Sequence, residues 1–295
     1  MTITRRTFGR ADCAELVAVL STWQPFGGHV TGLHPGDIGW HLRLPDEQID
    51  GTLHGWWRGD RLVAVALVEG VIARPQIAPG CGTDREVCEA VATVVAGMPG
   101  DEVWTDAEPG SLLRTLLVAR GWELDRDVWV ALHLSFTAGW DELAPAVLRE
   151  AAAVEGVAPT ATDADVHDRV AVQQVAFRQS TFAVEAWHRM AAGPGFDPSL
   201  DLLARDDDGV PVAAATAWAA GRDRCGILEP VGTHHEHRGR GHGRRVVLAA
   251  INALHRTGAS GVAVATPGRN QPGIALYRSC GLRPVESLQA LTRET

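Results

Sequence analysis

The alternation of apolar and polar positions changes its period repeatedly along the C-terminal half, which predicts strands that alternate with helices. Apolar residues on both sides of an acidic turn at 206–209 indicate a hairpin. Further on, a strand, a glycine-rich loop, a helix and another strand follow in an order typical of a parallel crossover unit. The predicted elements are a strand at 155–161, helices at 164–177 and 181–192, a hairpin over 201–218, a strand at 225–234, a helix ending near 256, a strand at 261–266, a short helix at 272–279 and a last strand near 287–293. This half is therefore expected to be α/β with a mixed sheet.

The N-terminal half repeats this order more faintly. Its predicted elements are a strand at 1–8, a helix at 11–23, a hairpin over 52–68, a helix at 85–97, a strand at 102–107 and a helix at 111–121. A shift of 160 residues superposes Glu69 on Glu229 and Gly121 on Gly281. We therefore expect two similar domains in tandem, over residues 1–137 and 153–295, joined by a connector at 138–152.

Length and composition agree with a two-domain protein outside the membrane. At roughly 150 residues per domain, 295 residues suffice for two cores. The longest apolar run, at 62–68, stops at Glu69, well short of the roughly 20 residues that a membrane span needs. The first residues are basic but lead into no apolar signal region, so we expect a cytoplasmic protein. The five cysteines are scattered without a CxxC pair, which predicts reduced thiols and argues against a structural zinc site.

The charge of the chain limits its partners. A net charge of −9 disfavours non-specific binding to nucleic acid over the whole chain. All the basic residues apart from histidine are arginines, which grip phosphate well. A local basic patch could therefore still hold a phosphate group. The sequence leaves a homodimer open.

The loop at 233–243 has the properties of such a patch. Glycines at 239, 241 and 243 alternate with basic residues directly before an amphipathic helix. Free amides and the positive end of the helix dipole converge there, which favours an anion such as phosphate. A flexible basic turn is the alternative. The loop has neither the GxxxxGK[ST] nor the GxGxxG spacing, and the pattern that remains is RxxGxG, formed by Arg238, Gly241 and Gly243.

This loop and a second motif resemble the GNAT acetyltransferase superfamily. Its pyrophosphate loop for acetyl-CoA reads (Q/R)xxGx(G/A) and joins the fourth strand of the fold to its third helix. The downstream stretch "NQPGIALYRSCGL" places Asn270, Tyr277 and Gly281 as the family does, with Gly273 for Ala and Leu282 for Phe. The resemblance covers residues 153–295 and implies two tandem GNAT-like domains, each a twisted mixed sheet flanked by helices.

The resemblance also implies roles for individual residues. The backbone N–H of Val231 would face the thioester oxygen, and the strand through Thr233 would bind the pantetheine arm. Tyr277 would protonate the departing sulfur, although a packing role is the alternative for this sole tyrosine. The residues expected to bind acetyl-CoA are Val231, Thr233, Arg238, Gly239, Arg240, Gly241, His242, Gly243, Arg244 and Asn270.

Glu229 is the leading candidate for the general base. It stands two residues before Val231, so strand alternation predicts that both side chains share one face. The base of the family often lies about two positions earlier, where this chain has Ile227. A structural or substrate-orienting role is the alternative for Glu229. The histidines at 234, 235, 237 and 242 lack closed ligand spacing, so no metal site is expected.

These observations predict an acetyl-CoA-dependent N-acetyltransferase that acts on a primary amine of a small molecule. The first half lacks RxxGxG and has neither Asn nor Tyr at the matching places, so we expect a degenerate copy. A tandem arrangement with one degenerate domain is similar to that of the mycothiol synthase-type acetyltransferases. Acetylation of protein or peptide amino groups, and a non-catalytic acyl-CoA sensor, are the alternatives.

Overall fold

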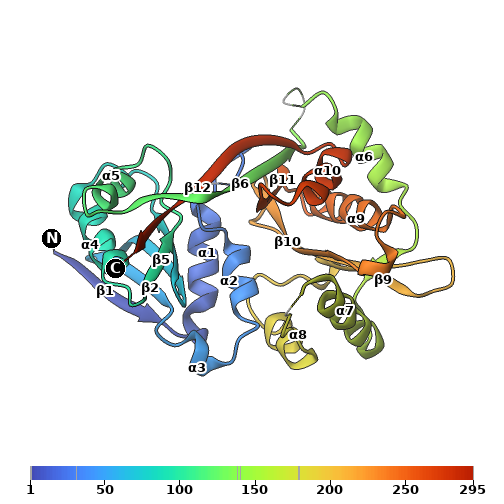
Figure 1. Ribbon diagram of the computed structural model, residues 1–295, viewed down its shortest axis with the longest axis horizontal. Coiled ribbons are helices and arrows are strands. Elements are labelled where there is room, and N and C mark those ends of the chain that lie inside the picture. The colour runs from blue at the N-terminus through green and yellow to red at the C-terminus, as the bar shows by residue number, and fades with distance from the viewer. Residues whose placement is uncertain (1, 31, 138, 140, 179, 295) are drawn as a thin grey trace.

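In the described part of the chain, 12 strands form one mixed sheet that runs through two halves (Figure 1). The computed structural model describes residues 2–30, 32–137, 139, 141–178 and 180–294. Residue 1 of the first predicted strand and residues 138 and 140 of the predicted connector lie outside this set. Helices flank the sheet, so the predicted α/β fold with a mixed sheet is confirmed.

The first half has the predicted elements and four more besides, two helices and two strands. Its strands are β1 (Ile3–Phe8), β2 (Leu53–Arg58), β3 (Arg61–Glu69), β4 (Ile72–Ile77), β5 (Glu102–Thr105) and β6 (Glu123–Ser135). Its helices are α1 (Cys13–Trp23), α2 (Pro35–His41), α3 (Asp46–Ile49), α4 (Arg85–Ala96) and α5 (Leu112–Val118). Sequence analysis missed α2, α3, β4 and β6. Two apolar clusters, one on each face of this part of the sheet, form its core.

The second half follows the predicted order closely, after the connecting helix α6 (Ala144–Ala152). Its strands are β7 (Val157–Pro159), β8 (Asp201–Arg205), β9 (Pro211–Trp218), β10 (Cys225–Thr233), β11 (Gly261–Pro267) and β12 (Arg283–Glu294). Its helices are α7 (Asp163–Ala176), α8 (Val184–Ala191), α9 (His242–Arg256) and α10 (Gln271–Ser279). β10 and β11 are parallel, so the predicted crossover through α9 is confirmed. In Figure 1, α9 and α10 lie on one side of this sheet and α7 and α8 on the other.

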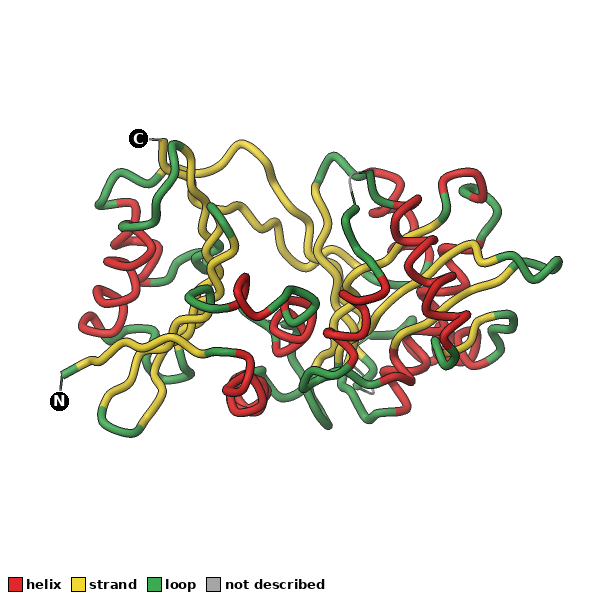
Figure 2. Tube along the Cα trace, turned by 90° about the horizontal axis from the view of Figure 1, so that it is seen from below, coloured by secondary structure: helices red, strands yellow, loops and turns green. Residues whose placement is uncertain are grey.

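The last strand of each half is exchanged with the other half. β6 pairs antiparallel with β11 and completes the sheet of the second half, while β12 pairs antiparallel with β5 of the first. The two exchanged strands also pair with each other, and Figures 1 and 2 show them bridging the halves. The boundaries at 137 and 153 remain a prediction, and the sheet is continuous across them.

One part of the predicted repeat is wrong. In strand order β3 holds the place of β9, and β4 that of β10. Glu69 ends β3, whereas Glu229 lies inside β10, so the two glutamates are not equivalent. Gly121 and Gly281 do correspond, because each follows the helix before the last strand and has a φ near 90°. Connections of different length between the strands explain why no single shift fits both pairs. None of the described helices has both the length and the apolarity needed to cross a bilayer.

Candidate active site

β10 has an open backbone edge where the cofactor strand was predicted. It pairs with β11 only over residues 225–227, but with β9 as far as Thr233. Hydrogen bonds alternate along an antiparallel pair, and His234 N donates to Val212 O at 2.9 Å. The backbone groups of Val231 and Thr233 therefore point to the opposite edge, which β11 has left. Among the described residues no strand pairs with this edge beyond residue 227, so an extended ligand can bind there.

A bulge in β10 determines which way its side chains point. The register against β9 shifts between Leu228 and Val231, so strict alternation fails there. Val231 packs with Leu228 in the apolar cluster under α9. The Glu229 carboxylate instead interacts with Asp37 of α2, on the other face. The prediction that Glu229 and Val231 share one face is therefore wrong. The role expected of Val231 requires only its backbone N–H.

The glycine loop leads into α9 with free amides. Gly239 and Gly241 have φ of 76° and 86°, and a Cβ at either would meet nothing within 4 Å. Backbone conformation rather than space therefore requires glycine at both positions. Gly241 is the N-cap of α9 without a capping side chain, and Arg245 N makes the first helical bond, to Gly241 O at 3.0 Å. The amides without an intrahelical acceptor are those of His242, Gly243 and Arg244.

The arginines of the loop differ in their contacts. Arg238 donates from Nε to Thr233 O at 3.3 Å and from Nη2 to a carbonyl at the end of α7, so it braces the loop. Arg244 forms an ion pair with Glu150 of α6, which engages its guanidinium away from the loop. Arg240 is exposed. Of the three, Arg240 is the one whose side chain makes no hydrogen bond or ion pair within the described residues.

Tyr277 lies on α10 and is 7% exposed, in the same apolar cluster that Val231 packs against. Burial, with a smaller contribution from Cys280, raises the pKa of Tyr277 to about 12. The hydroxyl therefore keeps its proton at neutral pH, as a general acid must.

Asn270 and Gly243 have packing roles in this region. Asn270 caps α10, with its Oδ1 accepting from Gly273 N at 3.3 Å and its Nδ2 donating to Thr266 Oγ1 at 2.8 Å. Its side chain is thus already engaged within the protein. A Cβ on Gly243 would lie 2.9 Å from Thr233 Oγ1, so this glycine allows α9 to approach β10.

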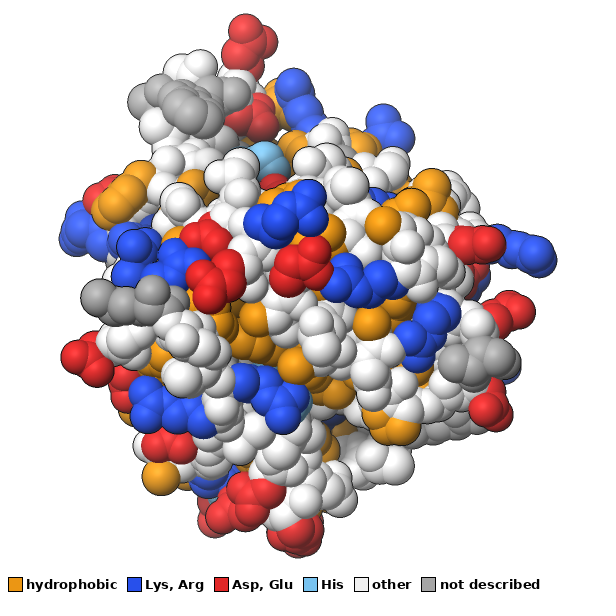
Figure 3. Space-filling view, turned by 90° about the vertical axis from the view of Figure 1, so that its left-hand side faces the viewer, with side chains coloured by type: hydrophobic (Ala, Val, Ile, Leu, Met, Phe, Trp, Pro, Cys, Tyr) orange, Lys and Arg blue, Asp and Glu red, His pale blue; other side chains and the backbone are white. Residues whose placement is uncertain are grey.

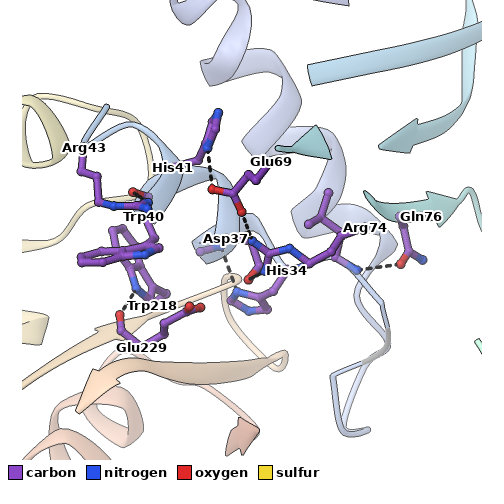
Figure 4. A network of polar contacts seen from close by, with 12 residues as sticks. His34, Asp37, Trp40, His41, Arg43, Glu69, Arg74, Gln76, Trp218 and Glu229 are labelled. Atoms are coloured by element: carbon purple, nitrogen blue, oxygen red, sulfur yellow. Dashed lines mark hydrogen bonds and ion pairs between the residues drawn. The ribbon is translucent and has the colours of Figure 1, made fainter. Parts of the chain in front are cut away.

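A charge network from the first half faces Glu229 (Figure 4). Arg74 donates to Asp37 Oδ1 at 3.0 Å and to Glu69 Oε2 at 2.6 Å. Burial raises the pKa of Glu229 to about 7, with the charge of Asp37 acting in the same direction and that of Arg74 against it. Burial acts on Glu69 too, but a hydrogen bond with His41 and the charge of Arg74 outweigh it and lower the pKa of Glu69 to about 2. At neutral pH Glu69 is ionised, while Glu229 is divided between its two forms.

α2 brings this network to β10. His34 accepts from Gly36 N on Nδ1 at 2.9 Å, so its Nε2 is the nitrogen that donates to Cys225 O, at 3.1 Å. A Cβ on Gly36 or Gly39 would collide with the ring system of Trp218. Trp218 in turn donates from Nε1 to Glu229 O at 2.7 Å. The helix is therefore fixed against the strand that carries Glu229.

Sequence analysis missed this part of the site, although one signal was present. His34 and Asp37 form a capping box around Pro35 at the first helical position, which is a typical helix start. The seven-residue helix that follows contains two glycines and shows no apolar period. Its glycines are required by a neighbour about 180 residues away, which local sequence does not reveal.

The N-terminus of the corresponding helix in the first half is capped by a carboxylate. α4 follows β4 as α9 follows β10, but Asp84 caps α4, accepting from Val87 N at 3.3 Å. Glu86 follows in the first turn, and Arg58 pairs with Asp84 at 2.6 Å. Figure 3 shows this end of the molecule, where Arg side chains are interspersed with Asp and Glu. An incoming phosphate would meet carboxylates here, as expected for a degenerate first half.

One further feature lies outside this site. A surface hollow of about 750 Å³, lined by α5 and the start of β6, includes Ser111, Arg114 and Trp122 but none of the predicted site residues. Within the described ranges, no group of three or more His, Cys, Asp or Glu side chains could hold a metal ion. His234 stacks on His235 in the glycine loop, with ring centroids 5.2 Å apart.

Comparison with known proteins gives the family. Residues 169–282 match the Acetyltransferase (GNAT) family. The chain is 30% identical over 207 residues to a mycothiol acetyltransferase of Clavibacter michiganensis, which covers 68% of this chain and 64% of the relative. It is 27% identical over 262 residues to a mycothiol acetyltransferase of Beutenbergia cavernae, covering 87% of this chain and 72% of the relative.

The fold of the whole chain is also shared with a solved structure. A tandem GNAT protein from the clavulanic acid biosynthesis pathway superposes with a TM-score of 0.60 at 16% identity, covering 99% of this chain and 98% of that one. At this identity the likeness concerns the fold alone. It extends over both halves, whereas the family match lies in the second. The second half therefore contains a GNAT acetyltransferase domain, and the fold of the whole chain is that of a tandem GNAT protein.

Proposed function

We propose that the chain transfers the acetyl group of acetyl-CoA to a primary amine of a small molecule. The observation that carries this proposal is the open edge of β10 at Val231 and Thr233, between the Glu229 carboxylate and the free amides of α9. The pantetheine arm is extended and contains amides, while the pyrophosphate is anionic. An open strand edge followed by a helix N-terminus fits these two parts in order.

The residues proposed to hold acetyl-CoA are those of this edge and loop. Val231 and Thr233 would bind the arm through their backbone. The pyrophosphate would lie against the loop made of Arg238, Gly239, Arg240, Gly241, His242, Gly243 and Arg244. Arg244 would contribute its amide, because its guanidinium is bound to Glu150. Asn270 would contact the ligand from the start of α10 while it also caps that helix.

When bound, acetyl-CoA supplies an acetyl thioester, whose acetyl carbon becomes bonded to the amine nitrogen as its bond to sulfur breaks. Glu229 takes a proton from the amine, directly or through a water. The Val231 N–H stabilises the negative charge that develops on the carbonyl oxygen. Tyr277 gives its proton to the sulfur and so completes the exchange. With a pKa of about 7, Glu229 is partly ionised near neutral pH and can accept a proton. With a pKa of about 12, Tyr277 is protonated at the same pH and can donate one.

The charges around Glu229 favour a cationic acceptor. The carboxylates of Asp37, Glu69 and Glu229 are opposed by the guanidinium groups of Arg43 and Arg74, which leaves a local excess of negative charge once Glu229 is ionised. An ammonium group is attracted to such a site. Both curated relatives are named for mycothiol, so a mycothiol-related amine is the first acceptor to assay.

The test is thiol release from acetyl-CoA across a panel of amines. The panel includes a mycothiol-related amine, aminoglycosides, amino acids and peptides. We expect turnover with at least one small amine and none when Tyr277 and Glu229 are both replaced. Turnover with peptides alone would favour protein acetylation, and tight binding of acetyl-CoA without any turnover would favour a sensor; either result contradicts the proposal.

A further inference from the structure

Two kinds of contact hold α2 of the first half against β10, the strand that carries Glu229. One is the hydrogen bond from His34 to Cys225 O at the start of β10. The other is the close packing of Gly36 and Gly39 on Trp218, which itself binds Glu229 O. α2 also packs against β9 and α8. A helix fixed in this way keeps its side chains at constant positions relative to Glu229.

The charged and titratable groups that surround Glu229 in the described chain come mainly from the first half (Figure 4). They are His34, Asp37 and His41 of α2, Arg43 after it, Glu69 of β3 and Arg74 of β4. On the second-half side, α7 packs on β10 and α8 packs on α2. Arg169 of α7 is already bound to Asp201, Gln173 and Thr216, and Arg189 of α8 donates to Arg43 O at 2.9 Å. β9 and β11 contribute no titratable side chain.

We propose that Asp37 is a positioning residue for the acetyl transfer, because with Arg74 it sets the proton affinity of Glu229 and hence the pH at which the amine is activated. The inference rests on the proposed function, in which Glu229 receives the proton of the amine. It assigns a task to a half that has lost its cofactor loop.

The contacts predict opposite effects from different members of the network. The negative charge of Asp37 disfavours ionisation of Glu229, and Asp37 also neutralises Arg74. Removing this charge therefore lowers the pKa of Glu229 by both routes. The positive charge of Arg43 favours ionisation of Glu229, so its removal raises that pKa. Arg43 donates to Trp40 O at 2.9 Å and forms no ion pair within the described residues. Its replacement should therefore disturb the fold little.

The experiment is a titration of Glu229 by carbon NMR in the full chain labelled at glutamate side-chain carboxyls. The signal of Glu229 is the one that Glu229→Gln removes, so the readout requires no turnover. We compare Asp37→Asn and Arg43→Gln with Asp84→Asn. Asp84 is a matched control because it too caps a helix of the first half and pairs with an arginine, but it lies at α4.

The expected midpoint falls by about one pH unit in Asp37→Asn and rises by about one in Arg43→Gln, the low end of the range for interacting charges. It stays unchanged in Asp84→Asn. If Asp37→Asn does not fold, Glu69→Gln tests the same direction, because the charge of Glu69 also raises the pKa of Glu229. Shifts of the same sign in the Asp37 and Arg43 variants, or no shift in either, would overturn the proposal. An absence of thiol release with every amine would count against the proposed function alone, since the titration does not depend on it.

Discussion

Replacement of Gly241 tests whether the N-terminus of α9 binds the pyrophosphate. Gly241 has a φ of 86° and open space where a Cβ would stand, so any side chain costs about 1–2 kcal/mol of backbone strain without a clash. Gly241→Asp adds a negative charge beside the free amides. At about 5 Å and an effective dielectric constant of about 20, its repulsion of one phosphate charge is about 3 kcal/mol. We expect the Kd for acetyl-CoA to rise by about two orders of magnitude.

Gly241→Asn is the matched control, because it has nearly the same size and tolerates a positive φ but carries no charge. Isothermal titration calorimetry at fixed ionic strength measures the Kd of both variants, and denaturant unfolding checks that their stabilities are equal. The parent should bind one acetyl-CoA per chain, since Asp84 occupies the corresponding place in the first half. Equal affinities of the Asp and Asn variants, or two equivalent sites in the parent, would refute the reasoning.

Three further changes have defined outcomes. Tyr277→Phe should lower kcat by about 10² to 10⁴ with acetyl-CoA binding preserved, because only the proton donor is lost; a rate within a few-fold of the parent would exclude that role. Gly39→Ala forces a Cβ into Trp218 and should lower the free energy of unfolding by about 1–3 kcal/mol, whereas Gly82→Ala, with open space around it, should change it by less than about 0.5 kcal/mol in the same urea titration. Burial lowers the pKa of His34 to about 4, so between pH 6.5 and 4 the unfolded chain binds more protons at this residue and stability falls as pH falls. From pH 7 to 5 this loss is about 2 kcal/mol, and His34→Gln should lose correspondingly less; an equal loss in both proteins would show that His34 stays solvated or protonated in the fold.

The second half could be predicted from the sequence because its signals are local. Each signal lies within a short stretch of sequence. These signals are the apolar period of α9, the glycines before it and the spacing from Asn270 to Gly281. The first half contributes to the site through contacts that join distant residues. Gly36 and Gly39 look like turn residues until Trp218 is placed against them, and the pairing of β6 with β11 joins segments more than 120 residues apart.

The environment of Glu229 shows the same limit. Alternation along β10 predicted its direction wrongly, because a bulge depends on the register against β9 and not on the composition of the strand. The residue itself was selected as a candidate because it stands two positions before Val231. Its proton affinity was not, since Asp37, Arg74 and Arg43 reach it from the other half.

The rate of acetyl transfer to one defined amine, measured against pH in the parent and in Glu229→Gln, tests the central claim most directly. An alkyl amine with a pKa of about 10.4 is neutral only about once in 10³ to 10⁴ molecules at pH 7, so a base must take its proton. In the parent, kcat/KM should rise through an inflection near pH 7, where Glu229 loses its proton. The Gln variant should be slower at pH 7 and lack that inflection. Its rate should partly recover as the pH approaches the pKa of the amine. An inflection of the same shape and midpoint in both proteins would contradict the account.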